Sequence, residues 1–310
     1  MLTSIEICSG AGGQALGLER AGFEHLALVE LEPQPCQTLR FNRPQWPVFE
    51  ADVHEFSALP YRDEVDLFAG GVPCPPFSLA GKQLGADDER DLFPEALRLI
   101  GECRPRAIML ENVRGLLSPK FETYRASLNQ RLEEMGYSPQ WQLLQAADYL
   151  VPQLRPRVVC VALPIGSEAS QRFAWPQARG HRITVGEALE SMMGAAGWEG
   201  AGAWAAAANE VAPTLVGGSK KHGGADLGPT RAKAAWAQLG VNGLTLAEDP
   251  PPPGFVGSPR LTVAMAAVIQ GFPPDWVFCG RKTAAYRQVG NAFPPPVAMA
   301  VGRAIATALS

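Results

Sequence analysis

Near its start the sequence reads Thr3-Ser4-Ile5-Glu6-Ile7-Cys8-Ser9-Gly10-Ala11-Gly12-Gly13-Gln14-Ala15, an apolar strand that runs into a glycine-rich turn. The turn has the G-x-G-x-x-A spacing that joins the first strand to the first helix in dinucleotide-binding folds. Glu30 ends the next predicted strand, about 20 residues on, where an acidic side chain binds ribose hydroxyls. Because the same geometry serves any adenosine ligand, the stretch predicts a nucleoside-type cofactor. A tight turn that needs glycine only for its backbone is the alternative.

The remainder of residues 1–163 continues this alternation of short apolar segments with helical ones. Strands are predicted near residues 3–8, 26–31, 48–50, 65–70, 106–111, 140–146 and 157–163, and helices near 13–22, 33–42, 92–102 and 120–135. Strands that alternate with helices are typical of α/β proteins with parallel sheets. We therefore predict an α/β fold with a doubly wound, Rossmann-like, mostly parallel sheet.

The character of the sequence changes after residue 163. Glycine, alanine and proline become frequent, helical periodicity fades, and the stretch ends in Pro250-Pro251-Pro252-Pro253-Gly254. Periodicity returns at residues 261–270 and again at 295–309. We predict a main domain built from residues 1–163 together with 275–310, and a smaller domain with irregular loops at 164–274.

Composition limits the classes of protein that this chain can be. Its 310 residues exceed one typical domain, and its formal net charge of −4 gives no global attraction to nucleic acid. The six cysteines, at positions 8, 36, 74, 103, 160 and 279, show no C-x-x-C spacing, so we expect neither a disulfide framework nor a metal site. The unpaired cysteines favour a reducing cytoplasm, and we also expect no membrane span and no signal peptide.

One cysteine stands in a loop that suits chemistry better than packing. The predicted strand at 65–70 ends in Gly70-Gly71, and Val72-Pro73-Cys74-Pro75-Pro76-Phe77-Ser78 follows. A thiol held by prolines at the carboxyl end of a strand is exposed and immobile, which suits a nucleophile. The alternative is a small buried side chain, the usual state of a free cysteine.

Three more polar segments lie where elements of the predicted fold begin or end. Glu111-Asn112-Val113 ends an apolar strand, and adjacent strand ends in a doubly wound sheet converge on one cleft, which would bring Glu111 near Cys74. Gln153-Leu154-Arg155-Pro156-Arg157 presents two guanidinium groups from a rigid turn. Gln288-Val289-Gly290-Asn291-Ala292-Phe293-Pro294 is predicted to be a ligand-facing turn before the last helix. A helix cap at residue 112 and a solvated arginine pair are the alternatives.

In this order and at these separations, the segments resemble the cytosine-C5 DNA methyltransferase family, in its bacterial form with a single catalytic subunit. The likeness covers residues 4–163 and 258–308. It includes Arg260-Leu261-Thr262 and Gln270-Gly271-Phe272-Pro273, which look like the family segment that follows the target-recognition region. The resemblance implies methyl transfer from S-adenosylmethionine to C5 of a cytosine flipped out of duplex DNA. No metal is implied.

The resemblance assigns the chemistry to four residues. Cys74 would attack C6 of the cytosine, which makes C5 nucleophilic toward the methyl group. Glu111 would hold and protonate the ring around N3. Arg155 and Arg157 would steady the flipped base and the covalent intermediate.

It also assigns residues to the two ligands. The cofactor would contact the first turn, the ends of the second and third strands, the loop before Cys74 and the turn before the last helix, at Cys8, Ala11, Gly13, Glu30, Leu31, Asp52, Val53, Gly71, Pro73, Asn291 and Ala292. DNA would contact Ser78, Lys82 and Gln83 in a loop that closes over it. The smaller domain would read the target site through a glycine-rich basic segment with Thr214, Lys220, Lys221 and Arg231. Cys8 and Leu31 depart from the family, which usually has aromatic residues there to stack on adenine.

The resemblance also implies binding partners, and three alternative functions have to be weighed against it. Duplex DNA is the expected partner, a cognate restriction endonuclease is a candidate one, and a monomer is expected. A nicotinamide-dependent dehydrogenase would leave the Pro73-Cys74 loop unexplained, and a DNA-binding module without catalysis would not need Glu111 and the arginines. The nearest rival is a tRNA cytosine-C5 methyltransferase of the same fold, although the region from 164 to 258 is generous for that enzyme.

Overall fold

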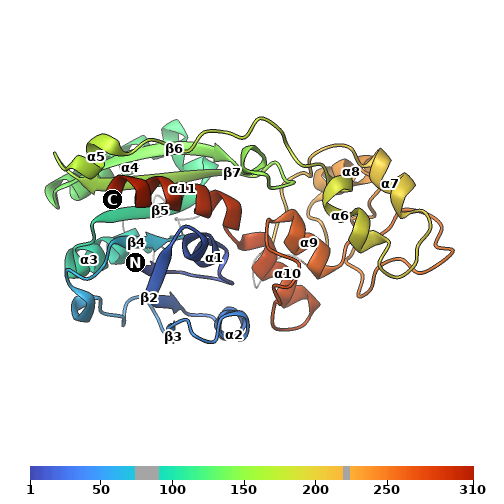
Figure 1. Cartoon of the computed structure of the whole chain (residues 1–310), viewed down its shortest axis with the longest axis horizontal. Coiled ribbons are helices and arrows are strands. Elements are labelled where there is room, and N and C mark those ends of the chain that lie inside the picture. Colours follow the sequence, from blue (N-terminus) through green and yellow to red (C-terminus); the bar gives the residue numbers. More distant parts are fainter. Residues whose placement is uncertain (74–90, 219–223) are drawn as a thin grey trace.

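A computed structural model of the chain describes residues 1–73, 91–218 and 224–310. Its centre is a seven-stranded sheet, counted in that described part, with strand order β3-β2-β1-β4-β5-β7-β6 (Figure 1). The strands are β1 (Leu2–Ile7), β2 (Phe23–Glu30), β3 (Val48–Glu50), β4 (Leu67–Gly70), β5 (Ala107–Val113), β6 (Tyr137–Gln145) and β7 (Pro156–Pro164). Strands β1 to β5 pair in parallel, whereas β7 pairs antiparallel with both β5 and β6. The predicted mostly parallel, Rossmann-like sheet is therefore confirmed.

Helices cover both faces of this sheet and build a second lobe beside it (Figure 1). The α-helices are α1 (Gly13–Arg20), α2 (Pro33–Asn42), α3 (Phe93–Cys103), α4 (Glu122–Glu134), α5 (Glu168–Arg172), α6 (Val185–Met193), α7 (Ala201–Ala207), α8 (Thr230–Gln238), α9 (Val263–Ile269), α10 (Lys282–Asn291) and α11 (Pro295–Leu309). Short 3₁₀ turns are η1 (Leu59–Tyr61), η2 (Arg114–Leu117), η3 (Pro119–Phe121) and η4 (Ala146–Tyr149).

The alternation of side chains along each strand separates two apolar cores. In β4, Phe68 packs into the core under α3 and α4, whereas Leu67 and Ala69 pack into the core under α1 and α11. This is the two-residue period of a strand that is buried on both faces. Helix α11 lies against α1 so closely that a Cβ added at Gly17 would lie 2.4 Å from the Cβ of Ala298. The first and last helices thus share one layer.

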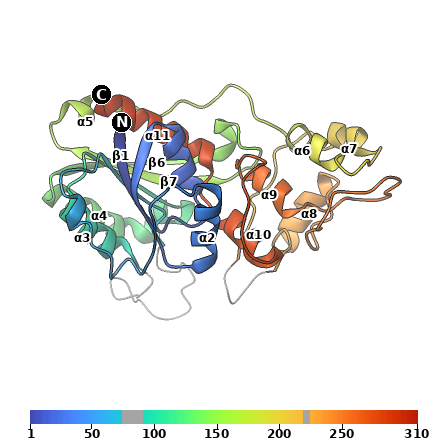
Figure 2. The same ribbon diagram turned by 60° about the horizontal axis from the view of Figure 1, so that its bottom comes forward.

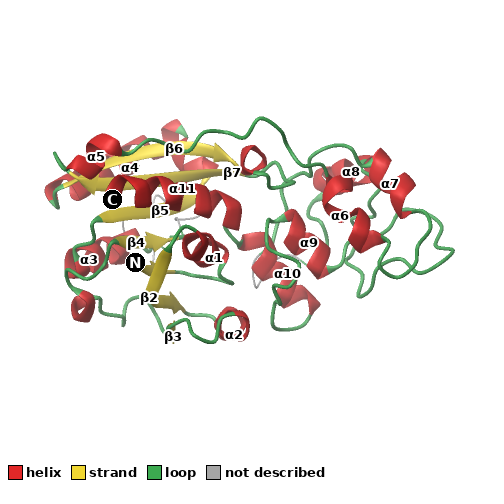
Figure 3. Ribbon diagram, viewed as in Figure 1, coloured by secondary structure: helices red, strands yellow, loops and turns green. Residues whose placement is uncertain are grey.

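The second lobe consists of helices and loops and contributes no strand to the described sheet (Figures 2 and 3). Its core is built around Trp204, Trp236 and Met265, and the same apolar cluster extends to Leu39 of α2. The prediction of an irregular region was therefore partly wrong, because α5 to α8 lie within it. These helices are five to nine residues long, too short for helical periodicity to emerge from an alanine- and glycine-rich background.

One expectation about the C-terminal segment needs correction. The polar segment Gln288–Pro294 is not a free turn, because its first residues complete α10. By length and composition alone, Lys282–Leu309 is also apolar enough to span a membrane, the single such stretch among the described residues. In its most apolar window of 18 residues, 61% is buried inside the fold, and the segment is divided into α10 and α11 at Pro294, as expected of core helices.

Candidate active site

A cavity of about 380 Å³ opens at the carboxyl ends of β1, β2 and β4. All the residues that the sequence assigned to the cofactor line it: Cys8, Ala11, Gly13, Glu30, Leu31, Asp52, Val53, Gly71, Pro73, Asn291 and Ala292. The cavity also has wall residues that the sequence did not indicate, among them Glu6, Gln14, Leu92, Arg287, Gln288 and Phe293. Gln14 lies in the glycine-rich turn, and Gln288 and Phe293 lie in the segment before the last helix. Because both segments contain residues assigned to the cofactor, the sequence could have indicated that these three also line the cavity.

The glycine-rich turn has the shape that its sequence requires. Gly10 and Gly12 have φ angles of +52° and +87°, which side chains rarely adopt. A Cβ at Gly13 would lie 2.1 Å from the carbonyl oxygen of Phe293, so the turn also needs glycine where it meets the cavity wall before α11. The backbone N–H of Gly10 donates to a carboxylate oxygen of Glu30 at 2.8 Å. The turn and the end of β2 therefore hold each other in place.

Glu30 is fixed by backbone donors at both of its oxygens. The second oxygen accepts from the N–H of Glu32 at 2.8 Å. Burial raises the pKa of Glu30, and the hydrogen bonds from the two N–H groups oppose that rise. A carboxylate held in this way at the end of β2 keeps free acceptor capacity for a hydroxyl pair, because each oxygen has two lone pairs.

The two family departures both lie in this cavity. Cys8 has a φ of +53°, a left-handed conformation that is uncommon outside glycine. Burial raises the pKa of its thiol, so the group stays neutral. Leu31 is 59% exposed and lines the opening. At these two positions, a planar ring would therefore contact a thiol and an aliphatic side chain rather than aromatic rings.

A second cavity, of about 510 Å³, adjoins the first. The two share four residues, Gly71, Pro73, Glu111 and Asn291. The second cavity is further lined by Val72, Asn112, Val113, Arg155, Arg157, Thr214, Leu215, Val216, Gly217 and Gly290. It therefore lies between the ends of β4, β5 and β7 and the segment that leads into the glycine-rich loop of the second lobe.

Glu111 and Arg157 form an ion pair at the boundary of the cavities. The Nε of Arg157 lies 2.7 Å from a carboxylate oxygen of Glu111, and both side chains are 14% exposed. Antiparallel pairing of β5 with β7 brings the two residues together. Burial raises the pKa of Glu111, while the positive charges of Arg157 and Arg155 oppose that rise. Burial and the two positive charges therefore act on the pKa of this carboxyl in opposite directions.

Arg155 is almost completely buried and binds backbone carbonyls. Its terminal nitrogens donate to Leu215 at 2.9 Å and to Gly290 at 2.7 Å, and more weakly to Ala292. Burial lowers the pKa of this guanidinium, and the positive charge of Arg157 lowers it further. Gln153 supports the same wall, because its amide accepts from the N–H of Leu215 and donates to Gln270. Arg155 therefore joins the segment at Leu215 to the end of α10 and to the residue that follows this helix.

The predicted DNA-contacting residues are only partly described. Cys74, Ser78, Lys82, Gln83, Lys220 and Lys221 lie outside the residues that the structure describes. The hydroxyl of Thr214 donates to the carbonyl of Leu154 at 2.5 Å, which anchors the segment before the glycine-rich loop. Arg231 is exposed on α8, whereas Lys233 pairs with Asp226 at 3.3 Å.

Sequence comparison identifies close relatives over nearly the whole chain. The profile of the C-5 cytosine-specific DNA methylase family matches residues 2–226 and 245–307. The chain is 57% identical to the Type II methyltransferase M.NaeI of Lentzea aerocolonigenes, over all of this chain and 76% of that protein. It is 56% identical to the Type II methyltransferase M.NgoMIV of Neisseria gonorrhoeae, over 99% of this chain and 98% of that protein.

Solved structures with low sequence identity share the fold. Dnmt2 of Spodoptera frugiperda superimposes with a TM-score of 0.68 at 18% identity, covering 98% of this chain and 99% of the other. The methyltransferase EhMeth of Entamoeba histolytica gives 0.70 at 14% identity, covering 100% and 99%. The family match spans most of the chain and coincides with both cavities. The protein therefore belongs to the C-5 cytosine-specific DNA methylase family and is an S-adenosylmethionine-dependent DNA cytosine-5 methyltransferase.

Proposed function

We propose that methyl transfer takes place where the two cavities meet, at Gly71, Pro73, Glu111 and Asn291. The first cavity would hold S-adenosylmethionine, which supplies the methyl group, and the second would hold the cytosine. The observation that supports this division is the shared wall itself, because two reacting groups must come within a few ångströms of each other. A base paired in duplex DNA cannot enter an enclosed site, so the cytosine must first be extruded.

We assign the nucleophile to Cys74, from its place in the sequence. Pro73 is the last described residue before it and lines both cavities, and consecutive Cα atoms lie about 3.8 Å apart. The thiolate sulfur would bond to C6, and the electron pair of the 5,6 double bond would become available at C5. After methylation, loss of the C5 proton and of the thiolate restores the double bond. The positive charge of Arg157 beside this wall favours a thiolate.

Glu111 and Arg157 would handle the polar edge of the base. A neutral Glu111 carboxyl donates a proton to N3 and limits the negative charge that develops on the ring. Arg157 holds this carboxyl by its Nε and retains other N–H groups for a base oxygen. We assign Arg155 to support of the cavity wall, because its terminal N–H groups are committed to backbone carbonyls.

The hydrogen-bonding groups that line the first cavity suit S-adenosylmethionine. Glu30 offers acceptors for ribose hydroxyls, Asp52 and Val53 would read the adenine edge, and Asn291 and Ala292 would line the methionine end. At position 10 an added Cβ would meet no atom of the protein within 4 Å, so glycine there leaves open space beside the cavity. The amide of Gln14 is buried and has no hydrogen-bond partner within the described residues, so it too has unused capacity beside the cavity.

Glu30→Ala is expected to weaken binding of S-adenosylhomocysteine about 10- to 100-fold, because two hydroxyls lose a charged acceptor. Titration calorimetry on the full chain measures this directly. Glu50→Ala, an exposed change at the end of β3, serves as the control and should bind like the wild type. Binding of NAD in competition with S-adenosylhomocysteine would contradict the cofactor assignment.

We place sequence recognition in the segment that begins at Pro213 and in the domain from 164 to 274. Thr214, Leu215 and Gly217 line the second cavity, so the recognition segment begins at the base-binding site. A Cβ at Gly217 would lie 2.6 Å from the side-chain oxygen of Asn291, which shows how closely this segment approaches the end of α10. Contacts with phosphate and contacts with bases would follow from the basic residues beyond it.

Single alanine variants of the basic residues separate these two kinds of contact. Lys220→Ala or Lys221→Ala should weaken all duplexes alike and reduce the salt dependence by about one unit of slope. Arg231→Ala should instead relax the preference at one position of the target site. The measurement is methylation of a randomised duplex library at several salt concentrations. Unchanged site preference and salt slope in all three variants would move recognition elsewhere in 164–274.

The relatives named above are Type II methyltransferases, so a transfer RNA substrate is not favoured. We propose that the enzyme acts as a monomer on chromosomal DNA in the cytoplasm, and that a restriction endonuclease with the same target site accompanies it. Bisulfite sequencing of plasmid DNA after expression tests the activity and reads the site at once. A plasmid without new 5-methylcytosine, from cells that contain folded protein, would contradict the proposed function.

A further inference from the structure

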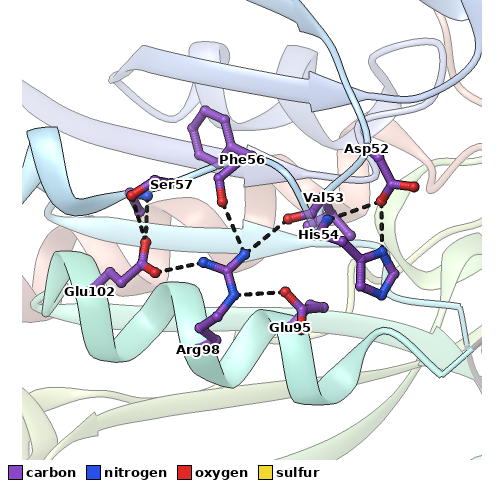
Figure 4. A network of polar contacts seen from close by, with 9 residues as sticks. Asp52, Val53, His54, Phe56, Ser57, Glu95, Arg98 and Glu102 are labelled. Carbon is purple, nitrogen blue, oxygen red and sulfur yellow. Dashed lines mark hydrogen bonds and ion pairs between the residues drawn. The ribbon is translucent and has the colours of Figure 1, made fainter.

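A network of polar contacts joins helix α3 to the loop that follows β3 (Figure 4). Arg98 lies at its centre. One terminal nitrogen of Arg98 donates to the carbonyl of Val53 at 3.0 Å and to that of Phe56 at 2.9 Å. A single nitrogen thus binds two carbonyls three residues apart and fixes the turn between them.

Two carboxylates on the same helix orient the guanidinium. The Nε of Arg98 donates to Glu95 at 2.7 Å, and its other terminal nitrogen donates to Glu102 at 2.6 Å. The second oxygen of Glu102 accepts from the N–H of Ala58 at 2.7 Å and from the hydroxyl of Ser57 at 3.1 Å. The helix therefore holds the loop at both ends, by two carbonyls at one end and by an N–H group and a hydroxyl at the other.

The loop held in this way is part of the cofactor cavity. Residues 51–58 contain no helix or strand. Their backbone is held partly by a local turn, in which the N–H groups of Glu55 and Phe56 donate to the carbonyl of Asp52 at 3.0 Å and 3.2 Å, and partly by α3. Ala51, Asp52 and Val53 line the cavity, and Val53 is itself a residue whose carbonyl Arg98 binds. Asp52 is oriented further, because one of its oxygens accepts from the backbone N–H of His54 at 3.0 Å and lies 2.7 Å from that ring. Its other oxygen has no protein partner within the part of the chain that the structure describes, so it can accept from a ligand.

We propose that Arg98, oriented by Glu95 and Glu102, is a positioning residue that holds Asp52 and Val53 in the arrangement that binds the adenine of S-adenosylmethionine. The inference rests on the proposed placement of adenine against these two residues. Arg98 does not line the cavity, so it acts through the loop. A planar guanidinium supplies donors in fixed directions to four groups at once, which a lysine ammonium cannot match.

The role predicts a change in cofactor affinity that is separate from the chemistry. Arg98→Ala in the full chain should weaken S-adenosylhomocysteine binding about tenfold, as expected when a coupled contact is lost. In steady-state kinetics the KM for S-adenosylmethionine should rise by a similar factor. The kcat at saturating cofactor and the KM for DNA should stay within about twofold of wild type, since no group that reacts is changed. Arg98→Lys should keep the charge yet recover only part of the affinity.

Arg106 offers a matched control. It also bridges a carboxylate and a carbonyl, Asp66 at 2.7 Å and Leu309 at 2.7 Å, but it lies at the start of β5, away from the cofactor cavity. Arg106→Ala should leave the affinity for S-adenosylhomocysteine unchanged. Thermal melts of the variants show whether any loss of binding follows a loss of folding.

A double-mutant cycle that combines Arg98→Ala with Asp52→Ala distinguishes a positioning role of Arg98 from a general loss of structural order. If Arg98 acts through this loop, the double variant should bind about as weakly as the weaker single variant, rather than by the product of the two losses. Independent, multiplied effects would overturn the inference, as would equal affinity of Arg98→Ala and wild type. An Asp52→Ala variant with unchanged affinity would show instead that adenine lies elsewhere, which contradicts the proposed placement. If Asp52→Ala binds weakly and Arg98→Ala binds normally, the positioning role of Arg98 is refuted, while the placement of adenine against Asp52 stands.

Discussion

Cys74→Ala is expected to abolish methyl transfer, with turnover lower by about four orders of magnitude or more, as when an enzyme loses its nucleophile. Without the sulfur, C5 of the ring has no means of becoming nucleophilic. Duplex DNA with 5-fluorocytosine at the target should trap a covalent complex with the wild type, because fluorine cannot leave C5 as a proton does. Denaturing gels of the enzyme–DNA mixture detect that complex.

Cys160→Ala is the control for this variant. Cys160 is completely buried in β7, where burial raises the pKa of its thiol, so it remains a neutral core side chain. The variant should lose some stability and still form the complex. A full yield of complex in Cys74→Ala would show that another thiol is the nucleophile.

Glu111→Gln is expected to lower turnover about 100-fold, in line with removing a positioned acid. Glutamine keeps the shape of the side chain and its contact with Arg157, but it has no proton of suitable acidity to give to N3. Affinity for S-adenosylhomocysteine should stay near wild type. Glu122→Gln, the same change on the exposed start of α4, is the control.

The same residue predicts the pH dependence of the wild type. Because burial raises the pKa of Glu111, a larger share of the carboxyl is protonated near neutral pH than its ordinary pKa allows. The rate should fall as pH rises through this raised pKa, since the proton donor is lost. That falling limb should be absent from Glu111→Gln in single-turnover measurements at saturating DNA. Equal turnover of the two proteins across the pH range would refute the assigned role.

The sequence predicted the parts of the fold that depend on local pattern. Strand β7 contains a continuous apolar run, β1 places Ile5 and Ile7 on either side of Glu6, and the glycine turn allows few other shapes, so the sheet could be predicted from them. The eleven cofactor residues also meet in one cavity, although their assignment came from likeness to a family rather than from geometry. The prediction of the sheet succeeds because backbone rules act over short distances, whereas the assignment of these eleven residues to a cofactor stays a prediction.

Other features depend on contacts between distant segments. The ion pair of Glu111 with Arg157 arises from antiparallel pairing of β5 and β7, which neither segment indicates alone. The burial of Arg155 is set by carbonyls at Leu215 and Gly290, far along the chain. Arg98 lies in a helix whose sequence is that of an ordinary amphipathic helix. Its role depends on hydrogen bonds to loop carbonyls, and backbone carbonyls cannot be recognised from residue types.

The close contact of α1 with α11 has a consequence for how the protein is made. Residues are added at the ribosome from the N-terminus, so the apolar face under α1 exists long before Val297, Val301 and Ile305 can cover it. The wall of the first cavity at Asn291 is also synthesised after the rest of that cavity's lining. A growing chain must therefore keep an exposed sheet face from aggregating until α11 has been made. A chain interrupted before α11 is expected to bind no cofactor, so modification of DNA has to wait for this helix.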